Sequence, residues 1–172
     1  MIKIPNWCDN ELVVMGPLND LVEFARTARS HQEEEVRIEP SDTDEKITEK
    51  LFNSLDGENK FKGALTFTAF VPIPEDLIKD GWYDFCVKNW GTKWDASEPS
   101  MEMTQRSIRY GFFTAWGPPL PVIYKMSEMF PNLRFTLRYY EGGMGFQGKL
   151  KLHKIRGIAE LKEEEYKGRR GG

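Results

Sequence analysis

The stretch Leu133-Arg-Phe-Thr-Leu-Arg-Tyr139 decides the fold class of this 172-residue chain. Its apolar and polar residues alternate strictly, as they do in a strand with one buried and one solvated face. Gly142, Gly143 and Gly145 then supply a turn into a last strand over residues 146–155. We therefore predict that the two strands form a hairpin.

The segments before this hairpin carry strand and helix patterns in turn. Residues 107–116 form a β-rich run that predicts a strand, and apolar residues at helical spacing predict a helix over 122–130. Residues 82–90 suit a short helix closed by a glycine, whereas residues 92–104 are expected to be loop. Alternation over residues 64–71 predicts one more strand, ended by prolines.

The N-terminal part adds a strand at residues 10–16 and a helix beginning at Leu18. Residues 31–63 carry ten acidic side chains against five basic ones and hold a short amphipathic helix, so we expect an insertion on the core. The apolar face of that helix is made of Ile47, Leu51, Phe52 and Leu55.

This element order predicts an α+β fold: a ferredoxin-like sandwich with one mainly antiparallel sheet, helices on one face and a small helical insertion. Residues 1–157 are expected to form a single domain. Residues 158–172 are expected to be a charged, partly disordered tail because they turn polar after the last predicted strand.

Composition excludes several classes of protein. Hydrophobic residues make up 40% and aromatic residues 13%, too much for a disordered chain. The N-terminus lacks the apolar run of a signal peptide and no stretch is long enough to span a membrane, so we expect a cytoplasmic protein. Cys8 and Cys86 lie far apart without a CxxC partner, which favours two reduced thiols over a disulfide or a metal site. We predict neither metal nor cofactor.

Four separated motifs resemble the YubB ferredoxin-like domain family, whose members are Api-like proteins of unknown function. They are Asn6-Trp-Cys-Asp-Asn-Glu-Leu, Asn89-Trp-Gly-Thr-Lys-Trp-Asp-Ala96, Phe113-Thr-Ala-Trp-Gly-Pro-Pro119 and Tyr139-Tyr-Glu-Gly-Gly-Met-Gly-Phe146. The resemblance covers nearly residues 1–155. It implies a ferredoxin-like domain carried by phages, plasmids or genomic islands in a bacterial host, and it brings no catalytic residue to transfer.

The same motifs contain the candidate ligand-binding residues. Tryptophans beside glycines, with polar residues close by in the pattern, can line a pocket in which rings stack on a ligand. The alternative is that each tryptophan closes the end of a small core and the polar residues satisfy turn backbone groups. The candidates are Asn6, Trp7, Asn89, Trp90, Lys93, Trp94, Asp95, Trp116 and Glu141.

Catalysis has weaker support, and we expect no catalytic residue. Asp95 and Glu141 are the only carboxylate pair worth testing, with Lys93 beside them, and an enzyme with a site near the tryptophan loops stays a third possibility. Gly142-Gly-Met-Gly145 does not open a helix and is predicted to be a hairpin turn, with an anion-binding nest as the alternative.

Nucleic-acid binding is the second possibility. Between Lys149 and Arg170 there are eight basic and four acidic residues, and a ferredoxin-like sheet can present Tyr139 and Phe146 for stacking on bases. Against it stands the net charge of −3. The first hypothesis is a non-catalytic binding or interaction module of a mobile element, with a protein or small-ligand partner and possible homodimerisation over a bare sheet face.

Overall fold

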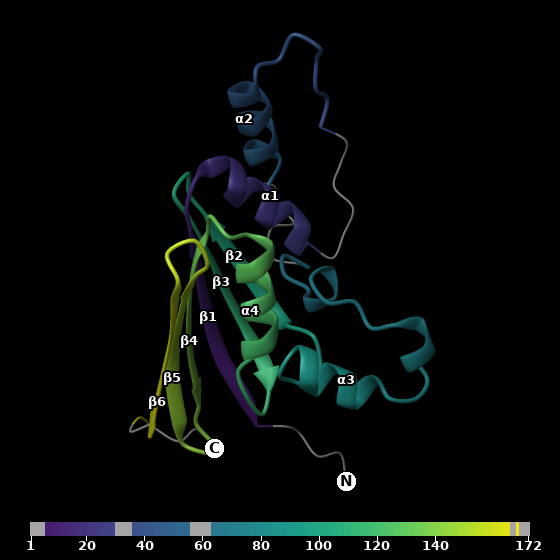
Figure 1. The fold of residues 1–172 in the computed structure, drawn as a ribbon, viewed down its shortest axis with the longest axis vertical. Helices are drawn as coiled ribbons and strands as arrows, with labels where there is room; N and C mark the ends of the chain where they lie inside the picture. Colours follow the sequence, from purple (N-terminus) through teal and green to yellow (C-terminus); the bar gives the residue numbers. More distant parts are fainter. Residues whose placement is uncertain (1–5, 30–35, 56–62, 166–167, 169–172) are drawn as a thin grey trace.

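The first strand of the chain, β1 (Trp7–Met15), lies at the centre of a six-stranded antiparallel sheet in the order β2-β3-β1-β4-β5-β6. The structure is a computed structural model, and it describes residues 6–29, 36–55, 63–165 and 168 (Figure 1). The other strands are β2 (Ser97–Met103), β3 (Ser107–Ala115), β4 (Arg134–Glu141), β5 (Phe146–His153) and β6 (Ile158–Glu165).

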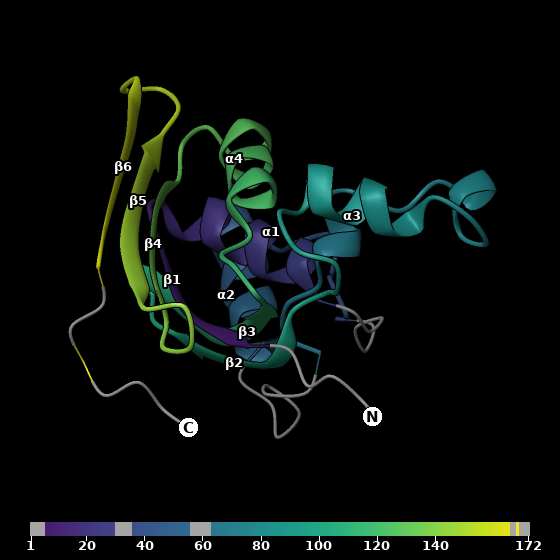
Figure 2. The same cartoon turned by 90° about the horizontal axis from the view of Figure 1, so that it is seen from below.

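Alternate residues of β1 separate the two faces of the sheet. Cys8, Leu12 and Val14 are fully buried under the helices α1 (Leu18–Ala28) and α4 (Leu120–Met129), which lie on one face (Figure 2). The intervening side chains, among them Asp9 and Glu11, point to the other face, as the two-residue period of a strand requires. We call this second face the open face, because no described helix packs on it.

The chain order β1-α1-β2-β3-α4-β4 combined with the strand order β2-β3-β1-β4 is the ferredoxin-like arrangement. It confirms the predicted α+β fold class. The strands β5 and β6 continue the sheet beyond β4 as an antiparallel meander. They widen the open face beyond β4 (Figure 1).

The connection from α1 to β2 holds the helices α2 (Asp44–Ser54) and α3 (Trp82–Asn89). The predicted amphipathic helix is confirmed: it is α2, and Leu55 at its end is buried. Two 3₁₀ turns, Phe67–Ala69 and Glu75–Leu77, precede α3. Parts of the predicted insertion, residues 31–35 and 56–62, lie outside the described residues.

Two element predictions in this connection are wrong. Residues 64–71 are not a strand: they turn through a 3₁₀ helix and bury Leu65 and Phe67 as plugs of the core. Residues 92–104 are not all loop, because 97–103 form β2, the edge strand beside β3. Pro99 and a register shift between Ser97 and Ser100 hide the strand pattern in the sequence.

The expectation of a disordered tail after residue 157 is also wrong for 158–165. These residues form β6, which pairs with β5 from Ile158 opposite His153 to Glu165 opposite Phe146. Nearly every side chain of β6 is exposed, so its sequence lacks the apolar alternation that would predict a strand. The remainder of the predicted tail, apart from Gly168, lies outside the described residues.

Within the described ranges, no helix combines the length and the apolar character needed to cross a lipid bilayer.

Candidate functional site

Three exposed tryptophans meet at the end of the sheet where β1 begins and β3 ends. The exposed fractions of Trp7, Trp94 and Trp116 are 38%, 40% and 46%. The rings of Trp7 and Trp94 are 6.1 Å apart, and Lys93 Nζ lies 3.9 Å from the ring centroid of Trp94 and 4.0 Å from that of Trp116. We call these four residues the tryptophan cluster. Its lysine sits between two rings, a geometry that attracts a cation to the ring faces.

The backbone around the cluster is fixed by contacts between distant segments. Gly91 ends α3 with φ 87°, and a Cβ there would lie 2.6 Å from the Pro121 side chain. Thr92 Oγ1 donates to the Ala115 carbonyl at 3.0 Å, and the Trp116 amide donates to the Asn6 carbonyl at 2.8 Å. The loop after α3 is therefore held against the end of β3.

Trp116 has a left-handed backbone conformation with φ 67°. This conformation costs a non-glycine residue roughly 1–2 kcal/mol and persists only when the surrounding structure enforces it. Backbone strain of this kind is concentrated at functional sites such as ligand-binding positions. An exposed tryptophan in a strained conformation is therefore a candidate binding residue.

Asp95 is a structural residue of the adjacent loop. Its carboxylate accepts hydrogen bonds from the amides of Phe67 and Ala96 at 2.7 Å, and from the hydroxyls of Thr66 and Thr68 at 2.6 and 3.3 Å. Four donors use both oxygens, so Asp95 fastens the 66–68 turn to the start of β2.

Glu141 has a similar role at the β4–β5 turn. It is 1% exposed, and its two oxygens accept from the amides of Gly143 and Met144 at 2.7 and 2.6 Å. Asn6 closes the turn from outside, because a Cβ on Gly143 would lie 2.8 Å from its side-chain carbon. The glycine-rich turn is thus wrapped around a carboxylate of the protein itself, which argues against an anion-binding nest.

The other two candidates, Trp90 and Asn89, make their contacts outside the cluster. Trp90 is 3% exposed and donates its indole N–H to the Val71 carbonyl at 2.9 Å, so it belongs to the core. Asn89 donates to the Phe85 carbonyl one turn earlier in α3, at 2.9 Å. Of the nine candidates, the structure therefore brings Trp7, Lys93, Trp94 and Trp116 together at the surface, with Asn6 adjoining.

Neither cysteine is placed for nucleophilic chemistry. Burial raises the pKa of Cys8 to about 12, with a smaller contribution from the Glu141 carboxylate, and burial also raises the pKa of Cys86. Thiols are nucleophilic as thiolates, and a raised pKa disfavours that form of both cysteines near neutral pH. Among the residues that the structure describes, no three His, Cys, Asp or Glu side chains gather in a way that could hold a metal ion.

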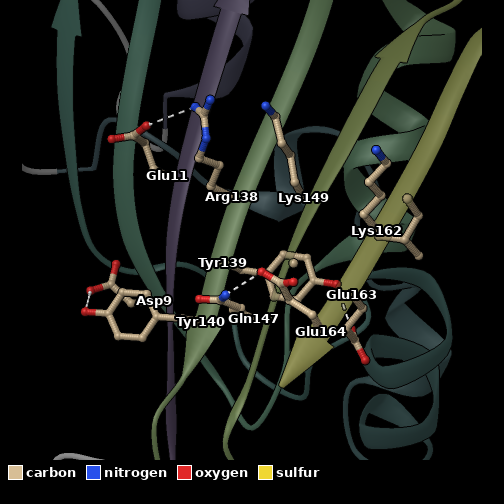
Figure 3. A pocket seen from close by; sticks show the side chains of 12 residues that line it. Asp9, Glu11, Arg138, Tyr139, Tyr140, Gln147, Lys149, Lys162, Glu163 and Glu164 are labelled. Atoms are coloured by element: carbon tan, nitrogen blue, oxygen red, sulfur yellow. Dashed lines mark hydrogen bonds and ion pairs between the residues drawn. The ribbon is translucent and has the colours of Figure 1, made fainter. Parts of the chain in front are cut away.

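A row of cations on the open face is the feature that the sequence analysis missed. Arg138 on β4 lies opposite Lys149 on β5, which lies opposite Lys162 on β6. Figure 3 shows the three side chains next to one another across the strands. We call them the cationic row. They line a groove of roughly 940 Å³, and Tyr140 and four carboxylates line it as well: Asp9, Glu11, Glu163 and Glu164.

The sequence carried a signal for part of this row. Strict alternation in residues 133–139 assigns Arg134 and Arg138 to the face opposite the leucines, and the same rule assigns Lys149 and Lys151 on the next strand. The register that aligns Arg138 with Lys149, and the existence of β6, come only from the structure.

The aromatic residues expected to stack on bases need a correction. Tyr139 is 2% exposed and Phe146 packs against the core, because both point toward the helix side of the sheet. Tyr140 points to the open face instead: it is exposed and donates its hydroxyl to Asp9 at 2.8 Å. Phe113 lies opposite Asp9 on β3 and is half-buried.

Comparison with known proteins agrees with this fold. A family model described as a ferredoxin-like domain in Api92-like protein matches residues 89–170. The crystal structure of the protein Api92 from Yersinia pseudotuberculosis is similar to this chain with a TM-score of 0.55 and 11% sequence identity, and the alignment covers 96% of this chain and 99% of that one. No curated protein matches the sequence. The likeness shows a ferredoxin-like α+β fold and carries no activity with it.

Proposed function

We propose that this protein is a non-catalytic binding module whose tryptophan cluster holds a planar, aromatic group of its ligand. The observation that carries the proposal is that three partly exposed tryptophans gather around one lysine at the surface. Tryptophan offers a large rigid surface for stacking, and clustered exposed aromatic area of this kind marks ligand or protein contacts.

The strain at Trp116 supports the same proposal. A tryptophan serving only to close the core gains nothing from a left-handed backbone and an exposed ring, whereas a binding residue must face the solvent. The contacts of Thr92 and Asn6 described above hold the backbone on either side of the Trp116 ring in place before any ligand arrives. Such preorganisation lowers the entropy lost on binding.

The roles of Asp95 and Glu141 speak against an enzyme at this site. An acid–base pair needs a proton-accepting or proton-donating oxygen directed at a substrate. Here both oxygens of Glu141 and one oxygen of Asp95 accept hydrogen bonds from backbone amides, and the second Asp95 oxygen accepts from the hydroxyls of Thr66 and Thr68. We therefore assign them to positioning the loops around the tryptophan cluster.

The cellular setting is part of the proposal. Following the resemblance of the four sequence motifs, we place the protein in the bacterial cytoplasm as the product of a phage, plasmid or genomic island. We also keep residues 1–157 as the domain core, to which β6 adds one strand.

Quenching of tryptophan fluorescence by adenosine 5′-monophosphate tests the cluster. We expect saturable quenching in the unchanged protein and its loss in the double variant Trp94→Ala/Trp116→Gly. Trp82→Ala is the matched control, because Trp82 lies on α3 beside Tyr83 and outside the cluster. Equal quenching in the double variant and in the unchanged protein would contradict the proposal.

A further inference from the structure

We propose that the ligand is single-stranded nucleic acid, with its phosphates along the cationic row of Arg138, Lys149 and Lys162 and its bases on the aromatic side chains at the tryptophan end. The stacking part rests on the proposed function above. The phosphate part rests on a separate observation, the charge arrangement of the open face.

The cationic row places like charges directly opposite each other on three neighbouring strands. Side chains in such positions have Cβ atoms about 4.5–5.5 Å apart, and like charges there destabilise a sheet. The pKa of Lys149 is lowered, first by Arg138 and then by Lys151, with a smaller contribution from Lys162. A bound polyanion would remove this repulsion.

Among the described residues, a carboxylate pairs with the arginine of the cationic row but with neither of its two lysines. Glu11 lies 3.7 Å from both Arg109 and Arg138, so one carboxylate is shared between two guanidinium groups. In the described part of the chain, no carboxylate oxygen lies within 4.0 Å of Nζ of Lys149 or Lys162. Two ammonium groups on neighbouring strands are thus available to phosphates.

The width of the row favours one strand over a duplex. Asp9 and Glu164 lie one step toward the tryptophans, and Glu160 lies one step away from them on β6. Negative charge therefore bounds the cationic row on the tryptophan side, whereas on the far side Glu160 lies opposite Lys151. One row of cations with such a boundary suits one chain of phosphates. A duplex would also hide its bases from the aromatic side chains, whereas unpaired bases can stack on them.

The aromatic side chains lie close enough to act on the same ligand. Trp7 and Glu11 are on one face of β1, and Glu11 lies opposite Arg138. Four residues of a strand span about 13 Å. Tyr140, opposite Asp9, lies between the two ends on the open face (Figure 3). A few nucleotides would bridge the tryptophan cluster and the cationic row.

Fluorescence anisotropy with labelled DNA and RNA single strands of about 15 nucleotides tests the inference. We expect Lys149→Ala/Lys162→Ala to weaken binding by roughly tenfold at low salt. The slope of log affinity against log salt should fall in magnitude by about 1.4, because each lost phosphate contact in a single strand contributes about 0.7.

Lys88→Ala/Lys125→Ala is the matched control. It removes two exposed lysines from α3 and α4, on the other side of the sheet, and should leave affinity and slope nearly unchanged. A polyglutamate of equal charge is the control ligand. Equal binding of polyglutamate, no binding at low salt, or equal affinities of the two lysine variants would overturn the inference.

The two proposals fail separately. If Trp94→Ala/Trp116→Gly leaves salt-dependent binding unchanged, the tryptophan cluster is not the stacking site, and the proposal that phosphates bind the cationic row still stands. Quenching by adenosine 5′-monophosphate without tighter, salt-dependent binding of the oligonucleotides would keep the tryptophan cluster and remove nucleic acid as its ligand.

Discussion

The hydroxyl of Tyr139 on β4 donates a 2.7 Å hydrogen bond to the Glu163 carboxylate on β6, two strands away. It reaches across β5 because Gly148, which lies between them in the register, has no side chain. A Cβ on Gly148 would lie 2.2 Å from the Tyr139 hydroxyl oxygen. This contact gives the exposed strand β6 one side-chain anchor to the body of the sheet, and through β6 it positions Lys162.

Replacing Gly148 with alanine is expected to displace the Tyr139 ring and loosen β6. Forcing one extra carbon into a packed site costs about 1–3 kcal/mol, which urea denaturation would measure, and hydrogen exchange of residues 158–165 should accelerate. Gly117→Ala is the control, because a Cβ there meets nothing within 4 Å. Gly148→Ala with the stability of the unchanged protein would show that Tyr139 does not anchor β6.

Removing the hydroxyls of Tyr139 and Tyr110 should have opposite effects. Tyr139→Phe loses a hydrogen bond to a carboxylate, so its free energy of unfolding should drop by about 1–2 kcal/mol. The Tyr110 hydroxyl is buried and has no hydrogen-bond partner among the described residues, so Tyr110→Phe should be neutral or stabilising. Thermal denaturation of the two variants side by side measures the difference. A Tyr139→Phe variant as stable as the unchanged protein would contradict the expected loss.

Stability is expected to fall in alkali. Burial raises the pKa of Cys8 from 9.0 to about 12 and also raises that of Tyr110. The folded protein therefore keeps protons that the unfolded chain releases, and stability is full below about pH 9 and declines as pH rises from there toward 12. Urea denaturation across this range should show a smaller decline for Cys8→Ala. The same decline in that variant would exclude Cys8 as a source.

The strain at Trp116 predicts a difference between two small substitutions. Trp116→Ala keeps the cost of a left-handed residue, whereas Trp116→Gly removes it, so the glycine variant should be more stable than the alanine variant by roughly 1 kcal/mol. Melting temperatures of the pair provide the measurement. Equal values would mean that the loop relaxes once the ring is gone.

The sequence predicted the elements with strong periodicity. Residues 133–139, with strict alternation, and the helix over 122–130 are in the structure as β4 and α4, and the ferredoxin-like class followed from their order. The prediction of a strand at 64–71 was wrong because its apolar residues are buried in the core from a 3₁₀ turn. A short apolar run has the same pattern in a strand and in such a turn.

Local pattern could not find the groups that long-range register creates. The motifs around Trp7, Trp94 and Trp116 stood out in the sequence, but only the packing of the loop after α3 on the end of β3 brings their side chains together. The cationic row depends on β6, whose charged residues carry no apolar signal. Trp90 and Glu141 belong to the same motifs, but they have structural roles, because both form hydrogen bonds with buried or turn backbone groups.

The central position of β1 governs how the chain folds during synthesis. Leu12 lies opposite Tyr110 on one neighbouring strand and Leu137 on the other, so the first strand made pairs only with strands made much later. At about 5–20 residues per second, β4 follows β1 from the ribosome by roughly 6–25 seconds. Until β3 emerges, shortly before β4, the alternating apolar side chains of β1 have no strand to pair with. The nascent N-terminal half therefore exposes apolar residues that chaperones can shield. The sheet is completed only near the end of translation.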